Sequence, residues 1–397
     1  MRGFEAERTR AAERGDPSLL AALFLLAGTG LAALWSASSG YALSLGKGPQ
    51  HFALRQLAFM GPSLLVFLAC ASIPLEKLRA KVGPITLGAL ASLFLPFLPG
   101  LGESRNGASR WIDLGFTTFQ PSELWKLASI FYLAHILEKR AEAVEEGRDA
   151  RGGSSLVPPL LLCALGCVVV FLQNDFSTAV IIGAAAAIMF WAAGAPVSFF
   201  LGLGAAAAPL AALSVLTSDF RLRRILAFLF PAYEPHGQGY QVLGSIKAIR
   251  SGGFLGKGIG LGTMKLASIP EVQSDFVFAA WAEETGFLGV LAFFALWGFF
   301  AWRAFRLAFA EEDRFRSYLC FGLSALLVME VLVNVAVAGG LVPATGIALP
   351  FFSAGGTSLV STACAGGLLY NLSRGRVPDA ARRDASSRAP AREAYDA

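Results

Sequence analysis

The sequence predicts an all-α polytopic membrane protein, with ten transmembrane helices and a long extracytoplasmic loop between helices 7 and 8. Its composition is 55% hydrophobic and only 15% charged, whereas a soluble chain carries about 25% charged residues. The mean hydropathy is correspondingly high, at +0.58. Apolar segments recur along the chain with the length that a helix needs to cross a bilayer, about 17 to 25 residues.

These apolar segments predict the spans in order. The first, SLLAALFLLAGTGLAALWSAS, is too long for the core of a signal peptide, so we expect it to be retained as a span. The later predicted spans are 52–73, 83–101, 121–138, 156–173, 177–194, 196–216, 277–302, 317–339 and 351–372.

The chain is expected to have three regions. Residues 1–16 form an N-terminal segment, and 17–373 form the membrane domain, whose long outer loop covers about 217–276. The tail, 374–397, is rich in Ala, Arg and Pro without an apolar period, which predicts disorder. Lys and Arg are enriched in the loops on the side of the N-terminus, and cytoplasmic loops carry such an excess. Both termini are therefore predicted to be cytoplasmic.

Several classes of site are excluded by pattern. The five cysteines all fall in apolar segments, without the spacing of a zinc site or a disulfide framework. The basic residues form no single stripe, so nucleic-acid binding is not expected. The run GFLGKGIG lacks the spacing of a Walker A loop, and no strand precedes it as a dinucleotide site requires. No nucleotide is expected.

A glycine-rich stretch, Ser251–Gly286, leads into the eighth predicted span. Its glycines oppose helix formation, so we expect a loop that approaches a ligand, with Lys257 and Lys265 on it. Asp275 lies where this polar loop becomes a membrane helix, a place where a carboxylate can be partly desolvated and still meet an aqueous substrate. The alternative is that Ser274 or Asp275 only caps the helix that follows.

A few charged residues fall inside or beside predicted spans, where charge is costly and is a functional candidate by default. Glu123 and Lys126 are three residues apart on one helix face; the alternative is an ion pair that fixes helix packing. Asp175 is either functional or a helix cap. Glu330 and Asn334 are expected to hydrogen-bond across helices.

Two outer loops combine Arg with aromatic residues. Arg110 stands beside Trp111, and FRLRRILAFLFP, which contains Arg224, has the pattern of a helix in the membrane interface. Such arginines suit a lipid phosphate, and ordinary interfacial anchoring is the alternative.

Five blocks, in this order, resemble the SEDS family of FtsW and RodA: NGASRWIDLG with QPSELWKLA, QNDFSTAV, GYQVLGSIKAIRSGGFLGKGIGLGTMKLASIPEVQSDFVFAAWAEETGFLG, and NVAVAGGLVPATGIALPFFSAGGTSL. The resemblance covers nearly the whole chain. It implies a ten-helix membrane protein that polymerises lipid II into peptidoglycan glycan strands. It also implies a class B penicillin-binding protein as partner, of the FtsI-like transpeptidase kind, with other divisome membrane proteins.

The resemblance also assigns residues. The essential acid of the family block PEAHTDFIF matches Asp275 in PEVQSDFVF, and the resemblance implies substrate binding by Arg110, Lys126, Arg224, Lys265 and Glu271. The chain departs from the family at Asn174 and Gly244, and at Ala354 and Thr357 in a block that usually reads SYGGSS. NGASRWIDLG and RLRRILAF look more like FtsW than RodA, whereas PATGIALP looks closer to RodA; we favour the FtsW resemblance, which implies a septal enzyme of the bacterial inner membrane.

The expected reaction is attack by a sugar hydroxyl on a lipid-linked sugar, with undecaprenyl pyrophosphate as leaving group. Asp275 is the expected base, and Arg, Lys or a divalent cation, Mg or Mn, would stabilise the leaving group. Three alternatives stay open: a RodA-like elongation polymerase, a lipid II flippase that relies on mid-membrane charges, and a scaffold that only recruits its partner.

Overall fold

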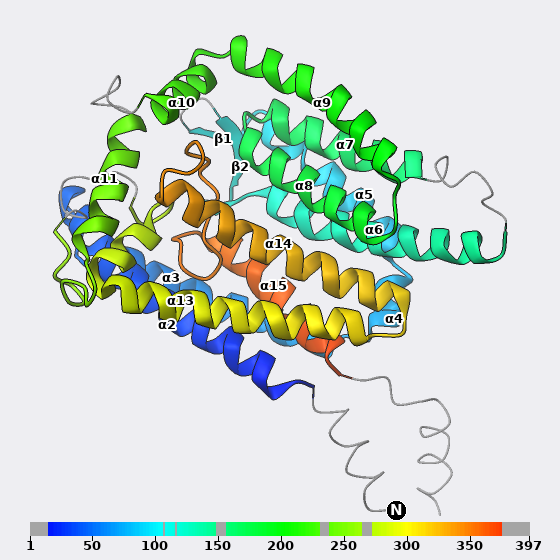
Figure 1. Cartoon of the computed structure of the whole chain (residues 1–397), viewed down its shortest axis with the longest axis horizontal. Coiled ribbons are helices and arrows are strands. Elements are labelled where there is room, and N and C mark those ends of the chain that lie inside the picture. Colours follow the sequence, from blue (N-terminus) through cyan, green and yellow to red (C-terminus); the bar gives the residue numbers. More distant parts are fainter. Residues whose placement is uncertain are drawn as a thin grey trace, which may run out of the picture.

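The computed structural model describes residues 15–105, 108–115, 117–147, 156–230, 238–263 and 272–374. Within them the chain is an α-helical bundle with one small sheet (Figure 1). The helices of the first half are α2 (Pro17–Ser44), α3 (His51–Ser72), α4 (Leu75–Arg79), α5 (Val82–Ser92), the short 3-10 helix η1 (Leu95–Phe97), α6 (Pro121–Glu145) and α7 (Val157–Leu172). Those of the second half are α8 (Phe176–Ala192), α9 (Val197–Leu216), α10 (Asp219–Leu229), α11 (Gln238–Ser251), α13 (Val277–Ala310), α14 (Arg314–Ala338) and α15 (Gly356–Leu372).

Helices coincide with all ten predicted spans. Five are long and apolar enough to cross a membrane, namely α2, α3, α9, α13 and α14, and three shorter apolar helices cover Val82–Phe97, Val157–Leu172 and Phe176–Ala192. The polytopic helical fold is therefore confirmed, whereas the number ten stays a prediction. The backbone N–H of Asp16 donates to Ser373 Oγ over 2.9 Å, so the two ends of the membrane domain lie at the same end of the bundle.

The core of the bundle is formed by α2, α3, α13, α14 and α15. Helix α15 packs on α3, while α13 packs on both α14 and α2, and α6 and α8 cover the other side of α14 (Figure 1). Buried apolar side chains from these helices form one continuous cluster. Helix α9, along the upper edge of Figure 1, is mostly exposed and packs chiefly on α10. Its apolar surface suits contact with lipid.

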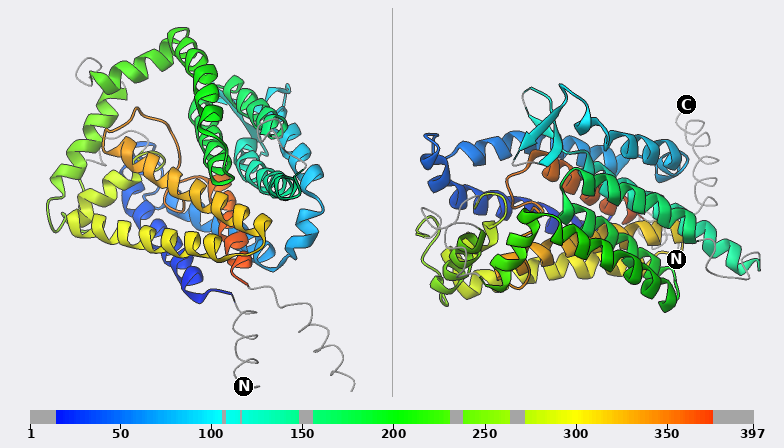
Figure 2. Two further views of the ribbon diagram at one scale, coloured as in Figure 1. Left: turned by 45° about the vertical axis from the view of Figure 1, so that its right-hand side comes forward. Right: turned by 90° about the horizontal axis from the view of Figure 1, so that it is seen from above.

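Three features of the structure lie outside the ten predicted spans. The loop after η1 forms an antiparallel sheet of β1 (Gly102–Arg105), β2 (Ala108–Asp113) and β3 (Thr118–Phe119), which projects from the helices in Figure 2. The long outer loop contains two helices, of which α10 agrees with the predicted interfacial helix and α11 was not expected. Helix α6 continues to Glu145, beyond the predicted end at 138. The N-terminal segment before Gly15 and the tail after Arg374 lie outside the described residues.

Candidate active site

A polar cavity of about 590 Å³ lies at one end of the bundle. The starts of α3, α6, α8, α13 and α15 meet there with the end of α14, the sheet and helix α10. This is the end of each helix that the sequence places on the outer side. The charged residues of the lining are Arg55, Arg110, Glu123, Lys126, Asp175, Arg224, Asp275 and Glu330. The cavity thus brings together the predicted site residues Arg110, Lys126, Arg224 and Asp275.

Asp275 is half-buried in the cavity wall, and its backbone is held from one side. Three successive carbonyls of residues 273–275 accept hydrogen bonds from the loop and helix that follow in sequence. The donors are the backbone N–H of Ala354, over 2.7 Å, the hydroxyl of Ser353, and the side-chain amide of Asn334, over 3.3 Å. The same Asn334 amide donates to Ile347 O over 2.8 Å. These bonds fix where the chain delivers the Asp275 carboxylate.

Neither Ser274 nor Asp275 caps the helix that follows them. Helix α13 begins at Val277, its N-cap position is Phe276, and no side chain caps it. The prediction that Asp275 serves only as a cap is therefore wrong, because the chain turns once more before the helix starts. The carboxylate is instead part of the cavity lining.

Two arginines face Asp275 from different elements. Arg224 extends from α10, and burial lowers the pKa of its guanidinium. The Asp275 carboxylate opposes that shift, while the positive charge of Arg110 adds to it, so Arg224 is close enough to interact with both. The Nε of Arg224 and the Nε of Arg110 are buried and find no acceptor among the described residues. Two adjacent guanidinium groups with unused donors form a site suited to an anion.

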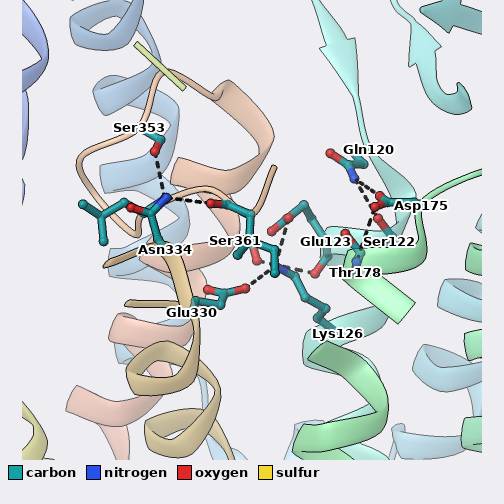
Figure 3. A network of polar contacts seen from close by, with 12 residues as sticks. Gln120, Ser122, Glu123, Lys126, Asp175, Thr178, Glu330, Asn334, Ser353 and Ser361 are labelled. Atoms are coloured by element: carbon teal, nitrogen blue, oxygen red, sulfur yellow. Dashed lines mark hydrogen bonds and ion pairs between the residues drawn. The ribbon is translucent and has the colours of Figure 1, made fainter. Parts of the chain in front are cut away.

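Asp175 holds Arg110 in place. Its carboxylate lies 3.3 Å from the Arg110 guanidinium and accepts from Gln120 Nε2 over 2.9 Å (Figure 3). It also caps α8 by accepting from Thr178 N over 3.4 Å. Arg110 stacks over the ring of Trp111, with 4.2 Å to its centroid. The expected cap is thus confirmed, and the same carboxylate also orients a cavity arginine.

Lys126 lies in a buried ionic cluster at the cavity floor. Its ammonium is 2.9 Å from Glu123 on its own helix and also pairs with Glu330 of α14, as Figure 3 shows. All three side chains are largely buried. The ion pair weighed in the sequence analysis is therefore present, and it joins α6 to α14. Lys126 lines the cavity, and its ammonium is paired there with the carboxylates of Glu123 and Glu330.

Other predicted residues lie elsewhere or outside the described residues. Lys257 is not in the cavity lining: its ammonium lies 2.6 Å from Glu283 on α13, and its expected approach to a ligand stays a prediction. Lys265 and Glu271 lie outside the described residues, and their roles stay predictions. Arg55, which lines the cavity, was missed by the sequence analysis. Its signal was a charge near the start of the predicted span 52–73.

Two departures from the family pattern have structural roles. Thr357 Oγ1 donates to Thr118 O over 3.1 Å and accepts from Gln120 N over 3.3 Å, which ties the start of α15 to β3 and α6. Asn174 has a left-handed φ of 61°, which Asn tolerates and which the fixed φ of proline forbids. Its side-chain oxygen accepts from Arg221 of α10 over 3.3 Å. Asn174 therefore helps to hold the helix that carries Arg224.

A divalent cation fits the described residues poorly. No group of three His, Cys, Asp or Glu side chains that could hold a metal is found among them. Three of the carboxylates that line the cavity pair with cations instead, Asp175 with Arg110 and both Glu123 and Glu330 with Lys126. We therefore derive no step through a metal.

The comparisons with known proteins agree with this geometry. A sequence family described as cell cycle protein, covering FtsW, RodA and SpoVE, matches residues 17–377. The chain belongs to this family. A probable peptidoglycan glycosyltransferase FtsW of Geobacter sp. (strain M18) is 41% identical over 290 residues, which cover 73% of this chain and 78% of the relative. Its counterpart in Geobacter sulfurreducens is 36% identical over 361 residues, 91% of this chain and 95% of the relative.

Solved structures of the family have the same fold. One, from work on the structural coordination of polymerization and crosslinking by a peptidoglycan synthase complex, is 30% identical with a TM-score of 0.75, covering 92% of this chain and 99% of that chain. The rod shape determining protein RodA of Thermus thermophilus is 27% identical with a TM-score of 0.68, covering 92% of this chain and 98% of that chain. The identity to FtsW relatives agrees with the predicted closeness to FtsW over RodA.

Proposed function

We propose that this protein is a peptidoglycan glycosyltransferase of the FtsW type, which polymerises lipid II into glycan strands. The observation that carries the proposal is the half-buried carboxylate of Asp275 beside two cavity arginines at one end of a membrane bundle. A polymerase of lipid-linked sugars needs a base and an anion site together at the membrane surface. FtsW relatives are named for this activity.

The reaction forms one bond and breaks one. The 4-hydroxyl oxygen of one lipid II sugar attacks the anomeric carbon of the lipid-linked chain, and the bond from that carbon to the pyrophosphate oxygen breaks. Asp275 accepts the hydroxyl proton as a general base. General-base catalysis of this kind raises the rate by about 10² to 10⁴-fold. Arg110 and Arg224 bind the undecaprenyl pyrophosphate that leaves, whose charge grows in the transition state. Lys126 stabilises the cavity floor through its two carboxylate partners.

The proposed partner is a class B penicillin-binding protein of the FtsI-like transpeptidase kind. The similar structure from a peptidoglycan synthase complex supports a joint assembly of polymerisation with crosslinking. Other divisome membrane proteins, a septal location and cytoplasmic termini complete the proposal. Fluorescence imaging of a tagged chain tests the location: a band at the septum is expected, and even labelling along the side wall would favour the elongation role instead.

The function is tested by incubating labelled lipid II with the purified protein and its partner, and by separating the products by size. Wild type is expected to form polymer and Asp275→Asn to form none above background. Asp113→Asn is the matched control, because Asp113 is an exposed carboxylate of the neighbouring strand β2, outside the cavity lining, and accepts from Gly115 N. Equal polymer from wild type and Asp275→Asn would overturn the catalytic assignment. Translocation of lipid II across vesicles without any polymer would favour the flippase.

A further inference from the structure

Helix α13 is broken near the cavity. At Gly286 the backbone has φ 63° and ψ −163°, a conformation essentially confined to glycine. The break separates an outer segment, Val277–Thr285, which follows Asp275 directly, from an inner segment, Phe287–Ala310. A broken helix leaves carbonyls and N–H groups without intrahelical partners on either side of the break. Such backbone is tolerated at membrane depth only where protein or water satisfies it.

The glycine-rich loop, Gly252–Thr263, inserts into this break. It satisfies the outer segment, because the N–H groups of Lys257 and Gly258 donate to Glu283 O and Glu284 O over 3.1 and 2.9 Å. It also satisfies the inner segment, since residues 287 and 288 donate their N–H groups to the carbonyls of residues 253 and 254 over 2.9 and 3.3 Å. The loop thus completes the backbone of α13 on both sides of the break.

Glycine is required at this contact for a steric reason. A Cβ on Gly286 would lie 2.2 Å from Gly256 N, and a Cβ on Gly256 would lie 2.2 Å from Glu284 O. Both contacts are with backbone atoms, which cannot move aside as a flexible side chain can. Gly256 of the predicted ligand-approaching loop therefore lies against the backbone of the broken helix.

A buried carboxylate locks the loop onto the outer segment. Glu283 is 0% exposed, and one of its oxygens receives the Lys257 ammonium at 2.6 Å and Thr263 N at 2.9 Å. The neighbouring Glu284 accepts from Ser36 of α2 over 2.5 Å, and Ser36 Oγ in turn accepts from Gly260 N over 3.0 Å. Charge-assisted bonds of this kind are the strong ones. The loop, the outer segment and α2 are joined at one point.

The bonds of Glu283 to Lys257 and Thr263, here called the clamp, hold the C-terminal end of the outer segment, while the bonds to the carbonyls of residues 273–275 hold the chain before its start. The inner segment is anchored independently, by its packing on α14 and by Arg303, which pairs with Asp16 at the opposite end of the bundle. The two segments are joined covalently at Gly286, whose lack of a side chain permits the break. We propose that Glu283 and Lys257 are positioning residues for glycosyl transfer, which orient the outer segment so that Asp275 faces the cavity. This inference rests on the proposed catalytic role of Asp275.

The test combines turnover with local hydrogen exchange in the full protein with its partner. Glu283→Gln and Lys257→Met each remove the ion pair and keep the size of the side chain. Each is expected to lower kcat about 10- to 100-fold, as misplacement of a reacting group does, with KM for lipid II unchanged. The double variant is expected to be no worse than the worse single variant, because the two residues act through one contact. Lys257→Arg should recover most of the rate.

Hydrogen exchange locates the effect. Loss of the clamp is expected to raise amide exchange in 277–285 and to leave 287–310 as in wild type. Asp16→Asn is the matched control, since it removes the ion pair at the other end of the same helix and should leave kcat unchanged. Unchanged kcat in both clamp variants, or a fall in kcat that only follows a lower unfolding temperature, would overturn the positioning role. Asp275→Asn in the same assay separates the two proposals: polymer from that variant would overturn the base and with it the positioning role, whereas no polymer from it together with unchanged kcat in both clamp variants would overturn the positioning role alone.

Discussion

Charged residues lie at both ends of the helix bundle, and their arrangement differs. At the end where residues 16 and 373 meet, each ion pair joins two neighbouring elements, and the pairs are Arg79 with Glu138, Arg303 with Asp16, Arg314 with Glu145 and Arg316 with Glu311. At the other end the same residue types surround a cavity of about 590 Å³. Charges at the first end join helices, whereas charges at the second end both join elements and line a cavity that a ligand can enter.

The largest expected difference between the ends concerns the buried lysine of the cavity floor. Lys126→Met leaves Glu123 and Glu330 buried without their cation, so the free energy of unfolding should fall by about 3 to 5 kcal/mol. Arg314→Met removes the exposed pair with Glu145 and should cost at most about 1 kcal/mol. Unfolding of both variants in the same detergent measures this. Equal losses would show that burial does not distinguish the two ends.

The second-largest expected effect is that of replacing the cavity arginines. Arg224→Ala or Arg110→Ala removes charged hydrogen bonds to the pyrophosphate, each worth about 1.5 to 3 kcal/mol. Polymerisation at low lipid II should therefore fall about tenfold or more for either variant. Arg314→Ala, at the opposite end, should polymerise as wild type does. Steady-state kinetics with labelled lipid II measures the rate of each variant. A normal rate in both Arg110→Ala and Arg224→Ala would show that these arginines do not form the anion site.

A pair of asparagines gives the smallest and sharpest comparison. Asn334 donates to Asp275 O and Ile347 O beside the cavity, while Asn371 donates to Cys70 O and Ile73 O at the other end. Replacement of either by Ala should cost about 1 kcal/mol of stability per lost bond. Only Asn334→Ala is expected to lower kcat as well, about fivefold. A matching fall in kcat for Asn371→Ala would contradict a local effect.

Much of the fold could be predicted from local pattern. The apolar runs predicted ten spans, and each of these contains a helix in the structure. The spacing of Glu123 and Lys126 predicted their ion pair. The partnership of Lys126 with Glu330, 204 residues away, has no local signal, because any of several helices could have packed on α6. The break at Gly286 was hidden as well, since one glycine in an apolar run reads as part of a helix.

The site was predicted in its residue types and only partly in its arrangement. The boundary position of Asp275 was visible in the sequence, and family blocks pointed to Arg110 and Arg224. That the glycine-rich loop completes a helix could not be predicted, because its partners on α13 are carbonyls and N–H groups that every residue carries. Every residue carries a backbone carbonyl, so the side-chain sequence does not show which carbonyls accept these bonds.

The central claim is that Asp275 acts in the chemical step and not in holding the substrate. The most direct measurement compares binding of labelled lipid II with polymer formation at saturating lipid II, for wild type and Asp275→Asn. The account predicts equal dissociation constants and a loss of turnover of about 10² to 10⁴-fold in the variant. Weakened binding with normal turnover at saturation would contradict it, because the carboxylate would then act in binding alone.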